Sequence, residues 1–104
     1  MDFKRLSKNL GLDEKEYIDL ANIFIDTSAN DLAALQSAIL QGDRVNALEI
    51  AHSMKGAALN MGIEEFADIA VAIERELLEG IGTELNPLMQ KFAALLDGLH
   101  RAIE

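Results

Sequence analysis

The stretch D-R-V-N-A-L-E-I-A-H-S-M-K-G-A-A-L-N-M-G, from Asp43 to Gly62, decides how the rest of the chain can fold. It predicts one amphipathic helix, with Asp43 as its N-cap and Gly62 as the left-handed residue that ends it. At about 100° per residue, one side of this helix is apolar and is expected to face a core. That side consists of Ala47, Ile50, Ala51, Met54, Ala58 and Met61. The opposite side carries His52, so the histidine is expected to face away from the core.

Two residues beside His52 on this outer side are hard to explain by packing. Gly56 lies in the helix interior, where glycine costs about 1 kcal/mol relative to alanine. Lys55 is the only Lys or Arg between Arg44 and Arg75. We therefore expect Gly56 to leave space next to the histidine and Lys55 to provide an exposed positive charge there.

Composition limits the domain organisation and the class of function. With 104 residues, of which 50% are hydrophobic, the chain is expected to form a single domain over residues 1–104. The absence of Cys excludes disulfides and thiolate metal sites. No apolar run is long enough to cross a bilayer, and no signal peptide is evident, so we expect a cytoplasmic protein. A net charge of −9 would repel nucleic acid and anionic lipid, so the expected partner is another protein, with no nucleic acid and no membrane.

Apolar residues at helical spacing predict further helices on both sides of this segment, and no stretch has the alternation of a strand. A short helix is expected over residues 2–9. A long helix is expected from the capping box of Asp13 and Glu16 to about Gln41, with a bend near residues 28–30 as the alternative.

Two helices are expected after Gly62. The first runs from about Glu64 to Glu79, and its short link to the preceding helix makes the two antiparallel neighbours. The stretch Gly80–Thr83 is expected to be a loop, and the last helix begins with either Thr83 or Asn86 as its N-cap. The sequence therefore predicts an all-α fold, an antiparallel up-down-up-down four-helix bundle with a short N-terminal capping helix.

The segment A-H-S-M-K-G-A-A-L-N-M-G, residues 51–62, resembles the signature of histidine-containing phosphotransfer (HPt) domains. In that family a His, a Lys three residues later and a Gly four residues later lie on one helix of a four-helix bundle. The resemblance assigns the phosphorylated histidine, the lysine, the glycine and the two closing positions of that helix to His52, Lys55, Gly56, Asn60 and Gly62. Met54 stands where leucine is more common, and a core position accommodates methionine readily.

The resemblance implies a function in multi-step two-component signalling. His52 would accept a phosphoryl group from an aspartate of one receiver domain and pass it to an aspartate of another. The protein would be an intermediate of the relay, without catalytic turnover of its own. Its partners would be the receiver domains of response regulators and hybrid sensor kinases, and we expect a monomer. The chain has no evident Mg²⁺ site, so no cofactor is expected on it and the Mg²⁺ is expected on the receiver.

The residues also fit this chemistry by themselves. A neutral imidazole nitrogen is a nucleophile near physiological pH, and a cation one turn away can offset charge on phosphoryl oxygens. Glu49, one turn before His52, is expected to accept a hydrogen bond from the second ring nitrogen and fix the tautomer. The candidate docking residues for a receiver are Leu48, Glu49, Leu59 and Asn60. Packing at the edge of the core is the alternative for the two leucines.

Two other functions agree with part of the sequence. Glu49 and His52 have the E-x-x-H spacing of di-iron carboxylate proteins, and Asp97 and His100 repeat it, but such a metal-binding bundle needs ligands that project inward. A helical adaptor without chemistry would leave the lysine and the glycine beside the histidine unexplained. His100 lies near the end of the last helix, where a positive charge suits the helix dipole, and is expected to be a surface residue.

Overall fold

The structure is a computed structural model that describes residues 1–80 and 84–104. Most of the predicted loop Gly80–Thr83 therefore lies outside the described residues. Within them every regular element is an α-helix: α1 (Phe3–Asn9), α2 (Glu14–Leu40), α3 (Arg44–Met61), α4 (Glu64–Glu79) and α5 (Leu85–Ile103). The prediction of an all-helical protein is confirmed. No helix in these two ranges is both long enough and apolar enough to cross a membrane.

The ends of α2 and α3 follow the local signals in the sequence. Asp13 and Glu16 form the capping box that begins α2. Asp43 accepts a hydrogen bond from the backbone N–H of Asn46 at the start of α3. Gly62 ends α3 with a φ of 71°, a conformation that glycine adopts without steric cost. The helix that carries His52 therefore has the bounds that the sequence predicts.

The start of α5 differs from one of the two predicted alternatives. The helix begins at Leu85 with Glu84 as its N-cap, so Asn86 is not the N-cap and lies in the first turn. Thr83, the other alternative, lies outside the described residues. Pro87 also lies in the first turn, where a backbone N–H has no partner within the helix. Proline is therefore tolerated at this position although it is not the first helical residue. For this reason the position of Pro87 does not determine where α5 begins.

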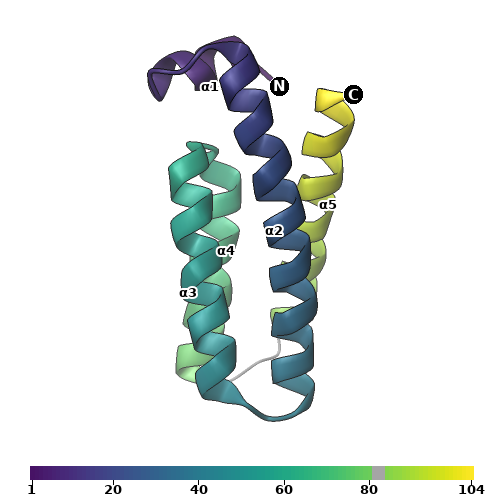
Figure 1. The fold of residues 1–104 in the computed structure, drawn as a ribbon. Helices are drawn as coiled ribbons and strands as arrows, with labels where there is room; N and C mark the ends of the chain where they lie inside the picture. Colours follow the sequence, from purple (N-terminus) through teal and green to yellow (C-terminus); the bar gives the residue numbers. More distant parts are fainter. Residues whose placement is uncertain (81–83) are drawn as a thin grey trace.

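The four longer helices lie side by side (Figure 1). α3 contacts α2 and α4, and α5 also contacts α2 and α4, so the four helices surround a common core. α1 lies across one end of this group and contacts α2 (Figure 1). α2 is continuous over its whole length, as the register of its apolar side predicts.

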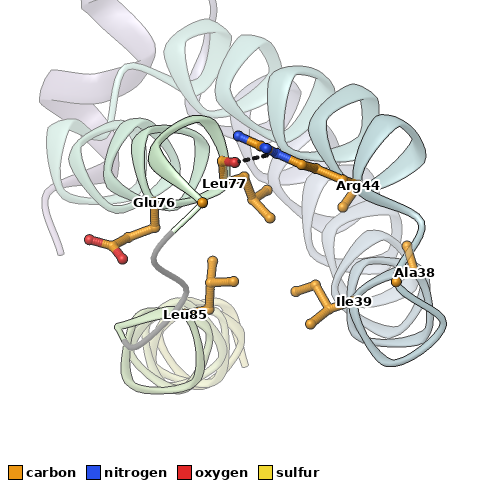
Figure 2. Close-up of a pocket in the computed structure, with 9 residues that line it drawn as sticks. Ala38, Ile39, Arg44, Glu76, Leu77 and Leu85 are labelled. Atoms are coloured by element: carbon orange, nitrogen blue, oxygen red, sulfur yellow. Dashed lines mark hydrogen bonds between the residues drawn. The ribbon is translucent and has the colours of Figure 1, made fainter.

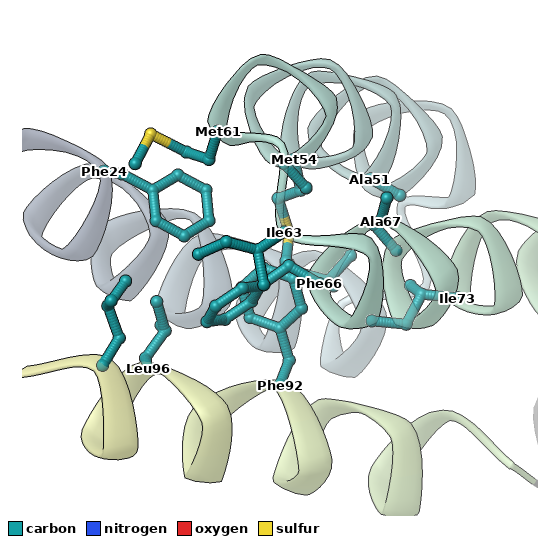
Figure 3. Packing of buried hydrophobic residues seen from close by; sticks show 14 of the residues in the cluster. Phe24, Ala51, Met54, Met61, Ile63, Phe66, Ala67, Ile73, Phe92 and Leu96 are labelled. Atoms are coloured by element: carbon teal, nitrogen blue, oxygen red, sulfur yellow. The ribbon is translucent and has the colours of Figure 1, made fainter. Parts of the chain in front are cut away.

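Three aromatic rings from three helices form the centre of the core. Phe66 of α4 packs edge to face against Phe24 of α2 and Phe92 of α5, with ring centroids 5.1 Å apart in both pairs (Figure 3). α3 contributes mainly small side chains to this core, and those that are fully buried include Ala47, Ala51 and Ala58. Ile50, predicted on the same side, is half-buried. Met54 and Met61 complete the buried side of α3, which packs against α2 and α4.

Both ends of α3 are bound to other helices. Tyr17, at the start of α2, is buried and donates a hydrogen bond to the carbonyl oxygen of Met61 over 2.7 Å. Arg44, at the other end, donates from Nε to the carbonyl oxygen of Leu77 over 2.8 Å (Figure 2). It also donates to the carbonyl oxygen of Leu78. These carbonyls belong to the last turn of α4, where they have no partner within the helix. The two contacts fix α3 along its axis.

Candidate functional site

His52 lies in the middle of α3, on the side that faces away from the core. Its side chain is 73% exposed, whereas Ala51 and Met54 on the inner side are buried. This is the orientation that the helical register predicts. The imidazole is therefore accessible to a partner protein without any rearrangement of the core.

A carboxylate from the neighbouring helix holds one edge of this ring. Oε2 of Glu74, on α4, lies 3.1 Å from Nδ1 of His52. An ionised carboxylate only accepts hydrogen bonds, so Nδ1 carries the proton at this contact. In the neutral ring the other nitrogen, Nε2, then keeps its lone pair. The contact with Glu74 thus leaves Nε2 as the ring nitrogen with a free lone pair.

Lys55 binds the same carboxylate through its second oxygen. Nζ of Lys55 lies 2.8 Å from Oε1 of Glu74, and the two side chains are 25% and 19% exposed. The prediction of a freely exposed lysine is therefore wrong. Lys55 lies on the flank of α3 that faces α4, so its stem is partly covered and its charge is paired.

The charge state of Glu74 follows from these two contacts. The hydrogen bond from Lys55 lowers the pKa of Glu74, partial burial acts in the opposite direction, and the hydrogen bond from His52 adds to the lowering. The net effect is a pKa below its usual value of 4.5, so the carboxylate is ionised at neutral pH. Lys55, Glu74 and His52 therefore form one connected set of charged and polar groups.

Glu49 does not have the role that its spacing predicts. Nδ1 of His52 is bonded to Glu74, and Glu49 is an exposed residue of the same helix. A signal for Glu74 was present in the sequence. His52 lies ten residues before Gly62, and Glu74 lies eleven residues after Ile63, so two antiparallel helices joined by this link bring them to the same level.

The other predicted site residues differ in their surroundings. A Cβ on Gly56 would meet no atom within 4 Å, so close helix packing is not the reason for this glycine. Leu48 is half-buried against the core, in agreement with its packing alternative. Leu59 is 60% exposed and borders a groove between the end of α3 and the start of α4. Asn60 is also exposed. Space and apolar surface are therefore available on the same face as His52.

The alternatives from the sequence have little support in this geometry. Glu49 and His52 project outward, whereas a di-iron site requires ligands that project into the bundle. Within residues 1–80 and 84–104, no three His, Cys, Asp or Glu side chains are grouped so that they could hold a metal ion. His100 is 54% exposed, and its Nε2 lies 3.5 Å from Oε1 of Glu104, the residue that directly follows α5, as expected for a surface residue.

The sequence model of the Hpt domain family matches residues 19–104. The matched range contains α3, α4, α5 and most of α2, and it includes every residue of the site described above. No curated protein and no solved structure matches the chain.

Proposed function

Because this chain belongs to the Hpt domain family, we propose that it is a phosphotransfer protein of a multi-step two-component phosphorelay, with His52 as the residue that carries the phosphoryl group. Its partners are then receiver domains of response regulators and hybrid sensor kinases. The arrangement of α2 to α5 is proposed to be the up-down-up-down bundle of the family. The main support is one observation: the exposed imidazole is bound through Nδ1 to Glu74, which leaves Nε2 free.

The proposed transfer is a substitution at phosphorus. The lone pair of Nε2 of His52 attacks the phosphorus of an aspartyl phosphate on a receiver. An N–P bond forms, the P–O bond to the aspartate breaks, and its electron pair returns to the aspartate carboxylate. Nδ1 keeps its proton throughout, so the phosphorylated ring gains a positive charge that faces Glu74. Transfer to the next receiver is the reverse of these steps.

Lys55 is proposed to offset charge on the phosphoryl oxygens. Phosphoryl transfer depends mainly on position and on electrostatic stabilisation, because the protein takes little part in the covalent chemistry. The same carboxylate binds the lysine and the imidazole, so Nζ is held beside the ring before any phosphoryl group arrives. Mg²⁺ is proposed to come with the receiver, and no cofactor is assigned to this chain.

The receiver is proposed to dock on the face of α3 that carries His52. Gly56 leaves open space one turn after the histidine, and Leu59 offers an exposed apolar contact. Glu49 and Asn60 are polar and exposed at the margins of this face. Leu48 contributes less, because the core already covers part of it. A monomeric state and a cytoplasmic location stay predictions.

The test is incubation with a phosphorylated receiver and Mg²⁺. This protein should acquire an acid-labile, base-stable phosphate, which is the behaviour of a phosphoramidate. The label should be absent from His52→Gln and present in His100→Gln. Circular dichroism on both variants serves to establish that they are folded. A label that persists in folded His52→Gln would overturn the assignment.

A further inference from the structure

We propose that Glu74 is a positioning residue that keeps the Nδ1 proton on phosphorylated His52 and thereby sets how readily the phosphoryl group leaves. This inference rests on the proposed function only in taking His52 as the residue that is phosphorylated. It concerns the stored phosphoryl group itself, whichever receiver supplies or removes it.

The geometry gives Glu74 two separate contacts. Oε2 faces Nδ1 of His52 at 3.1 Å, and Oε1 faces Nζ of Lys55 at 2.8 Å. The side chain of Glu74 is 19% exposed, so water competes only in part for these two oxygens. The carboxylate is therefore placed to respond to charge on either neighbour.

Phosphorylation at Nε2 changes which charges face each other. The phosphoryl group brings negative charge to one side of the ring, and the ring with its retained Nδ1 proton becomes positive. Lys55 can then donate to phosphoryl oxygens, while Glu74 stays with the positive ring. Every charge has an opposite partner in this arrangement, which is the condition for keeping charged groups partly buried.

The Nδ1 proton matters because it determines the leaving group. When the N–P bond of the protonated form breaks, the electron pair returns to Nε2 and a neutral imidazole is released. Without the proton the leaving group is imidazolate, which is a far stronger base and a poor leaving group. By favouring the protonated form, Glu74 is expected to make phosphorylated His52 a more reactive donor.

Other charged groups near the ring are few. In the described part of the chain, the hydrogen bond of His52 and the ion pair of Lys55 both go to Glu74. Glu49 is the nearest carboxylate along α3 itself. On α2, burial raises the pKa of Asp31, and this side chain forms no ion pair with the site. Glu74 is thus the carboxylate that acts on Nδ1.

The experiment phosphorylates the whole protein with phosphoramidate, so that no receiver is needed. The N–P bond of the reagent breaks, the bond from Nε2 to phosphorus forms, and the nitrogen of the reagent leaves as ammonia. The proteins to compare are wild type, Glu74→Gln, Glu74→Ala and the control Glu79→Gln. Glu79 is an exposed carboxylate at the end of the same helix.

The first measurement is the rate of loss of phosphate from His52 as a function of pH. Glu74→Gln removes a negative charge that faces the ring, so it should make the protonated form of phosphorylated His52 less stable. Its phosphate should then persist severalfold longer than that of wild type at alkaline pH, because a smaller fraction of the ring carries the Nδ1 proton there. In acid both rings are protonated and the rates should converge. Glu79→Gln should follow wild type.

The second measurement is the tautomer of unphosphorylated His52, from ¹⁵N–¹H spectra of its ring. The glutamine in Glu74→Gln still offers an oxygen to the Nδ1 proton, so this variant should keep the Nδ1–H tautomer. Glu74→Ala should lose that preference. A merely structural role for Glu74 would leave both the tautomer and the pH profile unchanged in the folded variants.

Lys55 provides the remaining control, since Glu74→Gln also releases the lysine. The pH shift caused by Glu74→Gln should persist when Lys55→Met is present in both proteins of the pair. Disappearance of the shift in that background would mean that Glu74 acts through Lys55, and would overturn the proposal.

The outcomes separate this inference from the proposed function. If phosphoramidate does not label His52 in the wild type, both are overturned. If His52 is labelled and the profile of Glu74→Gln matches wild type, only the role of Glu74 is overturned. If the profile shifts and no receiver exchanges phosphate with the protein, the relay function fails and the role of Glu74 stands.

Discussion

The two histidines of this protein are both exposed, and each has a carboxylate nearby, but the carboxylates come from different places. His52 on α3 pairs with Glu74 on α4, 22 positions along the chain, at 3.1 Å. Nε2 of His100, on α5, lies 3.5 Å from Oε1 of Glu104, four positions along the chain and directly after the last residue of that helix. The surroundings of His52 therefore exist only when two helices pack in the correct register. Those of His100 need only one helix.

The cations near the two histidines differ in the same way. Lys55 binds the carboxylate that also binds His52, so three side chains from two helices form one set. Arg101 binds Asp97 at 2.6 Å, and this pair is separate from the pair of His100 and Glu104. Exposed pairs within one helix contribute only a few tenths of a kcal/mol and hold no fixed geometry. The neighbours of the His52 ring are therefore positioned by the packing of two helices, whereas those of His100 are not.

The largest effect is expected from removing the packing that positions α4. Phe66→Ala deletes the ring that contacts both Phe24 and Phe92 and should lower the free energy of unfolding by about 3–5 kcal/mol. Phosphotransfer should fall with the folded fraction. Glu104→Gln, which removes the local partner of His100, should change stability by less than about 0.5 kcal/mol. Urea unfolding of both variants tests this, and equal losses would contradict the distinction between the two histidines.

The next effect concerns the two cations. Lys55→Ala should slow phosphoryl transfer from a receiver by about tenfold or more, because a preorganised donor to the phosphoryl oxygens is lost. Its stability should change by less than about 1 kcal/mol, since the ion pair with Glu74 is partly exposed. Arg101→Ala is the matched control and should leave the transfer rate unchanged. Equal rates in the two variants would make Lys55 a bystander.

Two glycines in helix interiors, each near a histidine, allow a matched test of whether the open space beside that histidine is needed for phosphoryl transfer. Gly56 follows His52 on α3 and Gly98 precedes His100 on α5, and a Cβ on either would meet nothing within 4 Å. Each substitution by alanine should therefore raise the free energy of unfolding by up to about 1 kcal/mol. Only Gly56→Ala should slow transfer, and Gly56→Leu should slow it further, because these side chains occupy space needed by the receiver. Thermal unfolding and transfer rates are the measurements. Slowed transfer in Gly98→Ala would remove the contrast.

The smallest effect is the pH dependence of stability that comes from Glu74. Its pKa in the folded protein is lowered from the usual value of 4.5, so it stabilises the fold above that pH and loses this contribution as the pH falls through the folded value. Glu74→Gln should lower the free energy of unfolding at neutral pH by less than about 1 kcal/mol, because the contacts are partly exposed. The difference from wild type should narrow in acid. A difference that grows in acid would reverse the assigned direction.

Local signals account for what the sequence predicts well. The caps of α3, Asp43 and Gly62, act through the backbone of their own helix, and the outward position of His52 follows from the register of the apolar residues around it. Gly56 is conspicuous because helix propensity alone disfavours it. None of these features depends on the packing of other helices, so reading along the chain is sufficient to find them.

The features that the sequence analysis missed depend on contacts between helices. The sequence predicts Glu49, and not Glu74, as the partner of His52, because spacing within a helix can be counted directly. The pairing of His52 with Glu74 also requires the register and the rotation of α4 against α3, which side-chain packing determines. The same contact explains why Lys55 is partly covered. A hydrophobic pattern specifies which side of each helix is buried but not which polar residues meet at its margins.

The anchoring of α3 at its two ends has a mechanical consequence. Tyr17 binds one end of α3 to α2, and Arg44 binds the other end to α4, so the helix is held at both ends by separate neighbours. The proposed docking of a receiver at His52, in the middle of α3, would therefore act on both end contacts at the same time. The two end contacts are expected to oppose tilting or sliding of α3, and so to keep the position of the imidazole the same for different partners.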